Sequence, residues 1–428
     1  MFYAEFSGSD VQIVIVCDFG VVNGGAARVA IDSARGLAEA GMAVTYICAI
    51  PPVSALLEHP NIDVRCLDFG SVWTRRNPLA AASQGIWNRS ARRAIETILD
   101  ALPRGQTVVH FHQWTKAFSP SVLSAGLRRG LPSVVSLHDY FITCPTGNYF
   151  NFPRGVPCTL TPMSLSCMTA NCDSRSYVHK LVRVLRQFAT RKAVADAGAS
   201  LSIVSMSPFA ERVIDQFIPK LHARYVVRSP IQIARGEPVP VAENTDFLFI
   251  GRLTNEKGVK FVAEAARDAG LPLTIVGDGP LLGELKAFGG TVTCTGWLGE
   301  AEVAALARRA RALIFPSRWY ETGGLVVLEA LAQGIPVIAS RTTAPVDFIA
   351  EGESGFIVDS GDRQALLDRM CRLRDNAVAQ RMGQEAYRRY WAKPQTIGVH
   401  TDALLEVYRS VLAEHERQHA SHPSGEFR

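Results

Sequence analysis

Short apolar runs alternate along the chain with segments in which apolar residues recur every three or four positions. The first run, Val11 to Cys17, predicts a buried strand. A glycine loop at Asn23 to Gly25 follows, then a helix from Ala26 to Ala40 that ends at Gly41, and then a strand from Ala43 to Ile50. A strand, a helix and a strand in this order predict two parallel strands, so the chain begins as an α/β protein.

The same alternation continues through the chain and predicts two α/β halves. Residues 231–244 contain two prolines, a glycine and mixed polar residues, and we place a domain boundary there. In the first half we expect further strands at Val108–Phe111, Ser133–Leu137 and Ser202–Met206, and helices from Tyr177 to about Asp196 and from Pro208. In the second half we expect strands at Phe247–Ile250, Leu273–Val276, Val292–Thr295, Ala312–Phe315 and Pro336–Ala339, and helices at Glu300–Arg311 and Leu325–Ala332.

The domains then comprise residues 1–230 and 244–390, with a C-terminal helix and a polar tail over residues 391–428. An irregular stretch of about residues 140–177, rich in Pro, Cys, Asn, Thr and Ser, has no helical or strand period and is expected to be an insertion in the first domain. Because ligands of parallel sheets bind at the carboxyl ends of the strands, we expect a site in a cleft between the two domains.

Composition narrows the class of protein. The 428 residues are 47% hydrophobic and 20% charged, which is typical of a soluble globular chain of two domains. The net charge of +5 and the pI near 8.7 are too mild to indicate nucleic acid, but they suit a nucleotide, a diphosphate or an acidic membrane surface. We expect no membrane span and no signal peptide. Nine cysteines in such a chain favour a reducing compartment, and hence the cytoplasm or the inner face of a membrane.

The strongest chemical feature is a pair of glutamates, Glu321 and Glu329, around a glycine pair that opens a helix. The backbone N–H groups of Gly323, Gly324 and Leu325 lie at the helix start and can bind an anion. Glu321 could accept hydrogen bonds from sugar hydroxyls. Glu329 has apolar neighbours, and because a buried carboxylate needs a partner it could bind paired ribose hydroxyls; a solvated helix carboxylate is the alternative.

A second group of residues suits a diphosphate. Residues 251–258 begin with Gly251 directly after a strand, and they carry the planar donor fork of Arg252 and the point charge of Lys257 at the start of the next helix. A turn with a solvated Arg and Lys is the alternative. Gly277 and Gly279 follow another strand and permit a ligand to approach the backbone, although a tight turn explains them equally well.

In combination, these motifs resemble the retaining glycosyltransferases of family 4, which have the GT-B fold. Residues 321–329 match that family's Glu-x7-Glu pattern, residues 251–258 its Gly-Arg-Leu-x-x-x-Lys-Gly motif, and residues 277–280 its Gly-x-Gly-Pro turn. Gly24 and Gly25 resemble its N-terminal glycine loop, and His138 resembles the histidine that faces the donor sugar. These elements follow the family's order over most of the chain. Many relatives have Glu-Pro-Phe-Gly where this chain has Glu321-Thr322-Gly323-Gly324, which leaves the sugar pocket and the donor open.

The resemblance implies two Rossmann-like domains that face each other across a cleft, an N-terminal one for the acceptor and a C-terminal one for the nucleotide sugar. It implies the transfer of a hexose from a nucleotide diphosphate sugar to a glycan or lipid-linked acceptor, as in bacterial polysaccharide biosynthesis. The implied catalytic residues are His138, Glu321, Arg252 and Lys257. The implied donor-binding residues are Gly24, Gly25, Gly251, Gly277, Gly279, Gly323, Gly324, Leu325 and Glu329.

In these roles Arg252 and Lys257 stabilise the leaving diphosphate, Glu321 holds the hexose and Glu329 holds the ribose. The chain has no Asp-x-Asp pair, so no metal site of that kind is indicated, and we expect no required cofactor. Arg252 and Lys257 would then supply the charge that Mg²⁺ supplies elsewhere.

The histidines and cysteines of the first domain leave two alternatives each. His110 and His112 share one face of a strand and favour a core or cleft position over a metal site. Cysteines in the insertion could bind zinc as a Cys₄ site or remain unpaired beneath a loop. These cysteines are Cys144, Cys158, Cys167 and Cys172. We also expect the insertion to cover the cleft and to shape the acceptor site.

Two helical regions carry many basic residues near tryptophans. The first has Arg75, Arg76, Arg89, Arg92 and Arg93, and the second has Arg175, Lys180, Arg183, Arg186, Arg191 and Lys192. Such helices can lie on an anionic membrane, although many are only solvated faces.

Other functions remain alternatives at this stage. A nucleotide-sugar epimerase or a phosphorylase can use the same architecture, but no lysine suggests a pyridoxal site. A dinucleotide-binding redox protein would need Gly-x-Gly-x-x-Gly after the first strand, which residues 20–25 do not match. A non-catalytic sugar-nucleotide-binding module is disfavoured by the paired carboxylates with Arg252 and Lys257.

Overall fold

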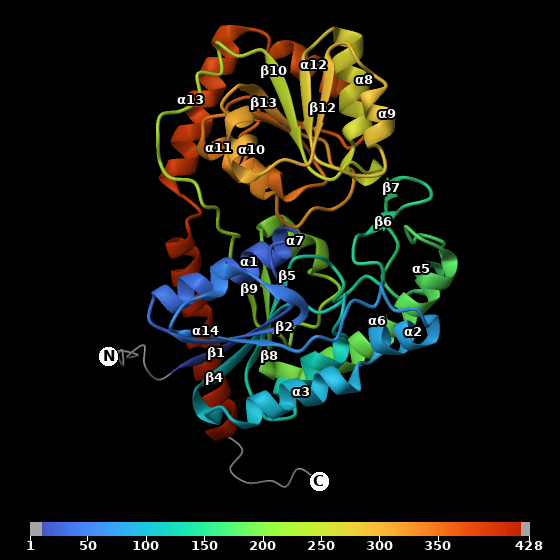
Figure 1. Ribbon diagram of the computed structural model, residues 1–428, viewed down its shortest axis with the longest axis vertical. Coiled ribbons are helices and arrows are strands. Elements are labelled where there is room, and N and C mark those ends of the chain that lie inside the picture. Colours follow the sequence, from blue (N-terminus) through green and yellow to red (C-terminus); the bar gives the residue numbers. More distant parts are fainter. Residues whose placement is uncertain (1–10, 421–428) are drawn as a thin grey trace.

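Two parallel β-sheets, one in each half of the chain, organise the protein (Figure 1). The computed structural model describes residues 11–420. Within them the first sheet has the order β3-β2-β1-β4-β5-β8-β9. Its strands are β1 (Gln12–Gly20), β2 (Ala43–Val53), β3 (Ile62–Cys66), β4 (Thr107–Gln113), β5 (Ser133–Leu137), β8 (Leu201–Ser205) and β9 (Arg224–Val226). The second sheet has the order β12-β11-β10-β13-β14-β15. Its strands are β10 (Asp246–Ile250), β11 (Leu273–Val276), β12 (Val292–Gly296), β13 (Ala310–Phe315), β14 (Val337–Ser340) and β15 (Gly355–Val358).

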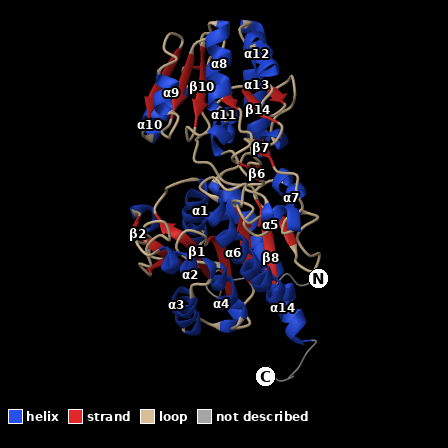
Figure 2. Ribbon diagram, turned by 90° about the vertical axis from the view of Figure 1, so that its right-hand side faces the viewer, coloured by secondary structure: helices blue, strands red, loops and turns tan. Residues whose placement is uncertain are grey.

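Helices cover both faces of each sheet (Figure 2). Those of the first half are α1 (Gly25–Glu39), α2 (Pro78–Ile86), α3 (Arg89–Asp100), α4 (Leu123–Leu127), α5 (Leu165–Thr169), α6 (Tyr177–Ala197) and α7 (Pro208–Ile214). Those of the second half are α8 (Val259–Ala269), α9 (Leu282–Lys286), α10 (Glu300–Ala307), α11 (Leu325–Ala332), α12 (Arg363–Arg372), α13 (Asn376–Ala392) and α14 (Ile397–Ala420). Side-chain caps explain where several helices begin. For example, the Ser176 side chain accepts a hydrogen bond from the His179 N–H at the start of α6.

The apolar runs of the sequence correctly predict the strands of the two sheets except β3, β9 and β15, with ends that differ by a few residues. The helix expected at Glu300–Arg311 is too long, because α10 ends at Ala307 and β13 begins at Ala310. All residues of β13 are buried, and their apolar run continues the helical pattern in the sequence. Strand β15 was not expected from the sequence.

The expectation that the insertion lacks regular structure is also wrong. It contains the short hairpin of β6 (Phe150–Asn151) and β7 (Val156–Pro157), and helix α5, which Ser164 caps. Strands of two residues are too short for an alternating pattern to appear, and a helix of about one turn shows no period. In Figure 1 the hairpin rises beside the gap between the two halves.

The last helix returns to the first half of the chain. Helix α14 packs against α1, and its Leu404, Tyr408 and Val411 belong to the same core cluster as β1 and β2. Figure 1 shows α14, in red, beside the N-terminal sheet. Gly36 permits this contact, because a Cβ added there would lie 2.1 Å from Thr401 Oγ1. The polar tail from residue 421 lies outside the described residues.

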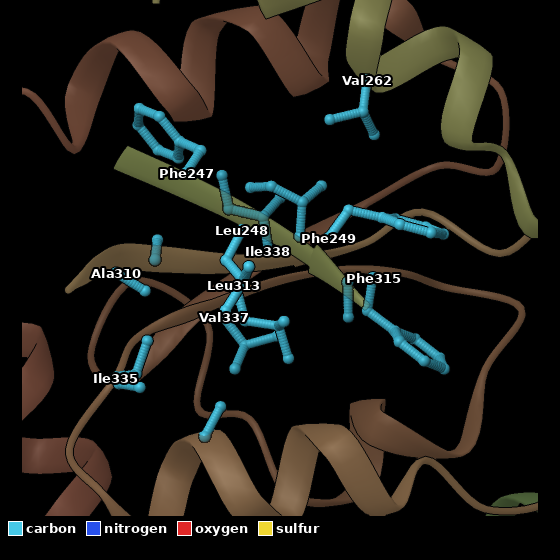
Figure 3. Packing of buried hydrophobic residues seen from close by; sticks show 14 of the residues in the cluster. Phe247, Leu248, Phe249, Val262, Ala310, Leu313, Phe315, Ile335, Val337 and Ile338 are labelled. Atoms are coloured by element: carbon cyan, nitrogen blue, oxygen red, sulfur yellow. The ribbon is translucent and has the colours of Figure 1, made fainter. Parts of the chain in front are cut away.

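Each sheet is the centre of its own core. In the second half, Leu248 of β10 lies with Leu313 and Val337 of the neighbouring strands on one face of the sheet. Phe247 and Phe249 lie on the other face, toward Val262 of α8 (Figure 3). In the first half, separate clusters of buried residues fill the two faces of the sheet. The two cores hold the carboxyl ends of β1, β4, β10 and β13 toward the space between the halves.

Candidate active site

A cleft of about 1170 Å³ lies between the two sheets. Each sheet has one place where the strand order reverses direction, between β1 and β4 and between β10 and β13. Ligands of doubly wound sheets bind at such points, outside the carboxyl ends of the strands. The loops that follow these four strands all line the cleft, so two switch points face one cavity.

Two helix N-termini meet across this cleft. Helix α1 begins after Gly24, α11 begins after Gly324, and neither has a side-chain cap. Gly25 and Leu325 face each other, since a Cβ added to Gly25 would lie 3.8 Å from Leu325 Cδ1. Gly24, Gly25, Gly323, Gly324 and Leu325 all line the cleft, as the sequence predicts. Because uncapped N–H groups carry partial positive charge, the pair of helix starts forms an anion site.

Three of the expected catalytic side chains gather on the C-terminal side. The Lys257 ammonium forms an ion pair with Glu321, and Ser317 Oγ donates to the same carboxylate at 3.0 Å. Burial raises the pKa of Glu321, but Lys257 and the hydrogen bonds that the carboxylate accepts lower it below its ordinary value. Arg252 is exposed, lines the cleft beside Gly251, and lies 5.9 Å from the Trp319 ring centroid.

Gly277 and Gly279 do not line the cleft. A Cβ added to Gly277 would lie 1.9 Å from Gly251 O, and one added to Gly279 would lie 2.6 Å from Leu253 O. Gly277 has a φ of +138°, which disfavours other residues. The two glycines therefore support the loop that carries Arg252 from behind, and their contact with a donor stays a prediction.

Glu329 is also absent from the residues that line the cleft. It lies one turn into α11, and burial raises the pKa of its carboxyl, with Arg28 acting in the opposite direction. Arg28 of α1 donates to Asp32 at 2.9 Å and to Glu300 at 2.7 Å, and so connects the two halves. The structure places Glu329 next to this contact, and its role toward a ribose stays a prediction.

His138 lines the cleft and closes a row of three histidines. Its Nε2 lies 2.9 Å from His112 Nδ1, and the rings of His110 and His112 are 4.2 Å apart. His110 is fully buried and bonds Tyr408 and Ser136, so the core position expected for it is confirmed. Burial lowers the pKa of His138 to about 3, which keeps the ring neutral at pH 7.

The N-terminal side of the cleft contains residues that sequence reasoning missed. The buried Asp18 carboxylate, at the end of β1, accepts the backbone N–H groups of residues 116–118 at 2.7 to 3.0 Å. This contact holds the loop after β4 and fixes Lys116, which lines the cleft together with Trp73 and Asp139. Burial raises the pKa of both Asp18 and Asp139 to about 6. The position of Lys116 just after a predicted strand is the one hint that the sequence offers, and no motif distinguishes this lysine from others.

The insertion forms one wall of the cleft, as we expect from the sequence. Phe150, Phe152 and Arg175 line it. The hairpin also reaches the other domain, since a Cβ added to Gly155 would lie 3.3 Å from Arg318. The insertion therefore contacts both halves of the chain.

The four cysteines of the insertion converge on a second, small cavity, lined by Cys144, Cys158, Cys167 and Cys172. Lys180 is fully buried there, and its Nζ lies 3.3 Å from Cys172 Sγ and 3.9 Å from Cys167 Sγ. Within residues 11–420, no group of three or more His, Cys, Asp or Glu is arranged to hold a metal ion. The Lys180 ammonium group therefore lies within hydrogen-bonding distance of two of the four thiols.

Comparison with solved structures identifies the fold. Sucrose-phosphate synthase from Thermosynechococcus elongatus superposes with a TM-score of 0.71 at 19% identity, over 94% of this chain and all of the other. HepE from Anabaena, solved in complex with UDP, superposes with a TM-score of 0.65 at 16% identity over the same share of each chain. Both are two-domain proteins of the GT-B architecture.

The sequence comparisons decide the family. Residues 23–157 match the family model described as glycosyltransferase family 4, and residues 244–376 match the one described as glycosyl transferases group 1. The chain is a GT-B glycosyltransferase. The family expected from the motifs is therefore confirmed.

The curated relatives of this glycosyltransferase include mannosyltransferases. GDP-mannose-dependent alpha-mannosyltransferase of Corynebacterium glutamicum is 36% identical over 27% of this chain, and O-antigen chain mannosyltransferase C of Escherichia coli is 30% identical over 39%. The alignments span 27% and 47% of these relatives' own lengths.

Proposed function

We propose that this glycosyltransferase moves a hexose from a nucleotide diphosphate sugar to a glycan or lipid-linked acceptor, with retention of the anomeric configuration. The observation that carries the proposal is the pair of uncapped helix starts, at Gly25 and Leu325, opposed across the cleft beside Arg252 and Lys257. The two helix N-termini and the two cationic side chains all contribute positive potential to the cleft, which suits the two phosphates of a donor.

Charge development explains how this arrangement would promote transfer. When the bond between the sugar and the diphosphate breaks, negative charge grows on the leaving phosphate. Arg252, Lys257 and the N–H groups before α11 are already in place to stabilise that charge, so no metal ion is required. Glu321 accepts from Lys257 and Ser317, which fixes its carboxylate where it can bind hydroxyls of the hexose.

His138 is suited to a neutral role. Its low pKa keeps it from acting as an acid near pH 7, and Thr322 Oγ1 donates to its backbone carbonyl at 2.8 Å across the cleft. The contact holds His138 next to the loop that carries Glu321, and both residues line the cleft, so we infer that His138 binds the transferred hexose from the N-terminal side.

Calorimetric titration of UDP, GDP and ADP tests the donor site. We expect one of them to bind, and Arg252→Gln to weaken that binding about tenfold or more, the effect of one charge-assisted hydrogen bond. Arg267→Gln, on the far end of α8, is the control. Proton NMR of the transferred sugar then tests retention: an α-linked donor should give an α-linked product, and a β-linked product would contradict the mechanism.

We further infer that α2, α5 and α6 rest on an anionic membrane. Unpartnered apolar side chains cover this side of the N-terminal domain, with Leu79 81% and Leu165 75% exposed. Val178, Leu181, Leu185 and Phe188 continue them along one face of α6, at 44% to 68% exposure. Figure 1 shows α2, α5 and α6 together on one side of the molecule.

The basic residues beside this apolar face favour an anionic membrane as its binding partner. Exposed Arg75 and Arg76 directly precede α2, which packs against α6, and an apolar face bordered by arginines matches an anionic bilayer surface. None of the helices in residues 11–420 has the length and apolar character to cross a bilayer. A location at the inner face of a membrane accords with this contact and stays part of the proposal.

Vesicle sedimentation tests the membrane contact. The wild type should sediment with vesicles of phosphatidylglycerol and not with phosphatidylcholine alone. Leu79→Gln with Leu185→Gln should abolish sedimentation, whereas Leu221→Gln, at a leucine that is 62% exposed elsewhere on the molecule, should not. Equal sedimentation of both variants would contradict this placement.

A further inference from the structure

Positive side chains surround one tryptophan on the acceptor side of the cleft. The Arg175 guanidinium carbon lies 3.8 Å from the Trp73 ring centroid, the Arg183 carbon lies 5.7 Å from it, and the Lys116 Nζ lies 5.9 Å from it. Arg186 lines the same wall and lies 4.4 Å from the Phe141 ring centroid. Four like charges in one partly buried wall repel one another unless an anion joins them.

The protein supplies too few anions for these cations. Asp173 pairs with Arg183 at 3.0 Å, and its side chain is fully buried. In the described part of the chain, no ion pair involves Lys116, Arg175 or Arg186. Asp139 and Asp18 are the other carboxyls that face them, since both act on the charges of Lys116 and Arg186. One positive charge is therefore left in excess among these four cations, and at least Lys116 and Arg186 are removed from water by burial.

Unpartnered polar atoms mark the same place. Trp73 Nε1 and Thr115 Oγ1 are buried, line the cleft, and have no hydrogen-bond partner within residues 11–420. Both can donate a hydrogen bond. Buried donors without a partner are costly in a folded protein, so their position beside Lys116 indicates that a ligand with acceptor oxygens completes the site.

We propose that this pocket binds a phosphate group of the acceptor. The proposal rests on the proposed function and deepens it, because it assigns the acceptor to the phosphate-bearing sugars or lipids. A phosphate ester or diphosphate carries negative charge near pH 7 and several acceptor oxygens, which suits the excess positive charge and the two free donors. A carboxylate has only two oxygens with which to contact the same cations and donors. The donor diphosphate and the acceptor phosphate thus occupy opposite walls of one cleft.

Calorimetry with a simple phosphate ester decides the proposal. The protein is first saturated with the nucleoside diphosphate that it binds best, so that the donor site is filled, and phenyl phosphate is then titrated. We expect binding in the wild type, and about tenfold or greater weakening in Lys116→Met and in Arg175→Gln. Lys192→Met removes an exposed lysine of α6 and is the control.

The nucleoside diphosphate titration separates this proposal from the proposed function. If the nucleotide binds but phenyl phosphate does not, or if Lys116→Met and Arg175→Gln bind it like the control, the pocket is not a phosphate site. If benzoate binds as tightly as phenyl phosphate, the assignment to phosphate is wrong. Failure of the nucleotide itself to bind would instead contradict the proposed function.

Transfer assays then distinguish the source of the phosphate. Glucose 1-phosphate represents a soluble acceptor, and N-acetylglucosamine joined by a diphosphate to a decyl chain represents a lipid-linked one. We expect Lys116→Met to lower kcat/KM about tenfold or more for the acceptor that the enzyme uses, while donor binding stays unchanged. An equal kcat/KM of the wild type and Lys116→Met would overturn the proposal.

Discussion

Replacement of Lys257 by Met should affect stability and turnover separately. The side chains of Lys257 and Glu321 are 16% and 14% exposed and form an ion pair. Removal of one partner of a buried pair costs about 3–5 kcal/mol, because the other charge is left without compensation. Removal of a group that stabilises the leaving phosphate should also lower kcat about 100- to 1000-fold.

The pH dependence of the stability loss in Lys257→Met shows whether the ion pair with Glu321 causes it. Lys257 holds the pKa of Glu321 below its ordinary value of 4.5, so the pair contributes stability that is complete above pH 4.5 and is lost as pH falls through the folded pKa. The deficit of Lys257→Met should therefore be largest near pH 7 and should shrink below pH 4.5. Urea unfolding at several pH values measures it.

Two further variants complete the assay. Lys260→Met removes a neighbouring lysine that is 44% exposed and pairs with Glu284, and should change stability and kcat little. Lys257→Met combined with Glu321→Gln should recover most of the stability but none of the activity. The reasoning is refuted if Lys257→Met retains wild-type kcat, or if its stability loss equals that of Lys260→Met at every pH.

Three other predictions concern the surroundings of the site. Burial lowers the pKa of His138 from 6.5 to about 3, so the free energy of unfolding should fall as pH drops below 6.5. Measured by urea unfolding, His138→Gln should lose less of this free energy between pH 7 and pH 4 than the wild type does. An equal loss in both proteins would contradict this. Gly277→Ala should destabilise the protein by about 2 kcal/mol or more and lower kcat, because the new Cβ meets Gly251, whereas Gly283→Ala, which has open space, should not. Lys180→Met should keep or raise the melting temperature, because it removes a buried ammonium whose partners are thiols; a large fall would show that the ion is needed.

Local patterns in the sequence predict a large share of this fold. Central strands such as β1, β10 and β14 contain continuous apolar runs, because helices cover them on both faces. Such runs are visible without any tertiary information. The Gly-Arg and Glu-x7-Glu motifs could also be found, since each lies within one strand–loop–helix unit. Their expected positions at the cleft are confirmed for Arg252, Lys257 and Glu321.

The remaining features depend on contacts between distant parts of the chain. Asp18 fixes Lys116 from 98 residues away, and no local pattern marks either residue. Gly277 also permits the close approach of its backbone to Gly251, a role that only its spatial neighbours reveal. The return of α14 to the first domain likewise follows from packing against α1, not from its own sequence.

Nucleoside diphosphate release tests the central claim most directly. The purified protein is incubated with a panel of nucleotide sugars and acceptors, with and without EDTA, next to Glu321→Ala. We predict release from one donor that resists EDTA and is lost in the variant. Release that needs a metal ion, or that persists in Glu321→Ala, would contradict the account of this cleft.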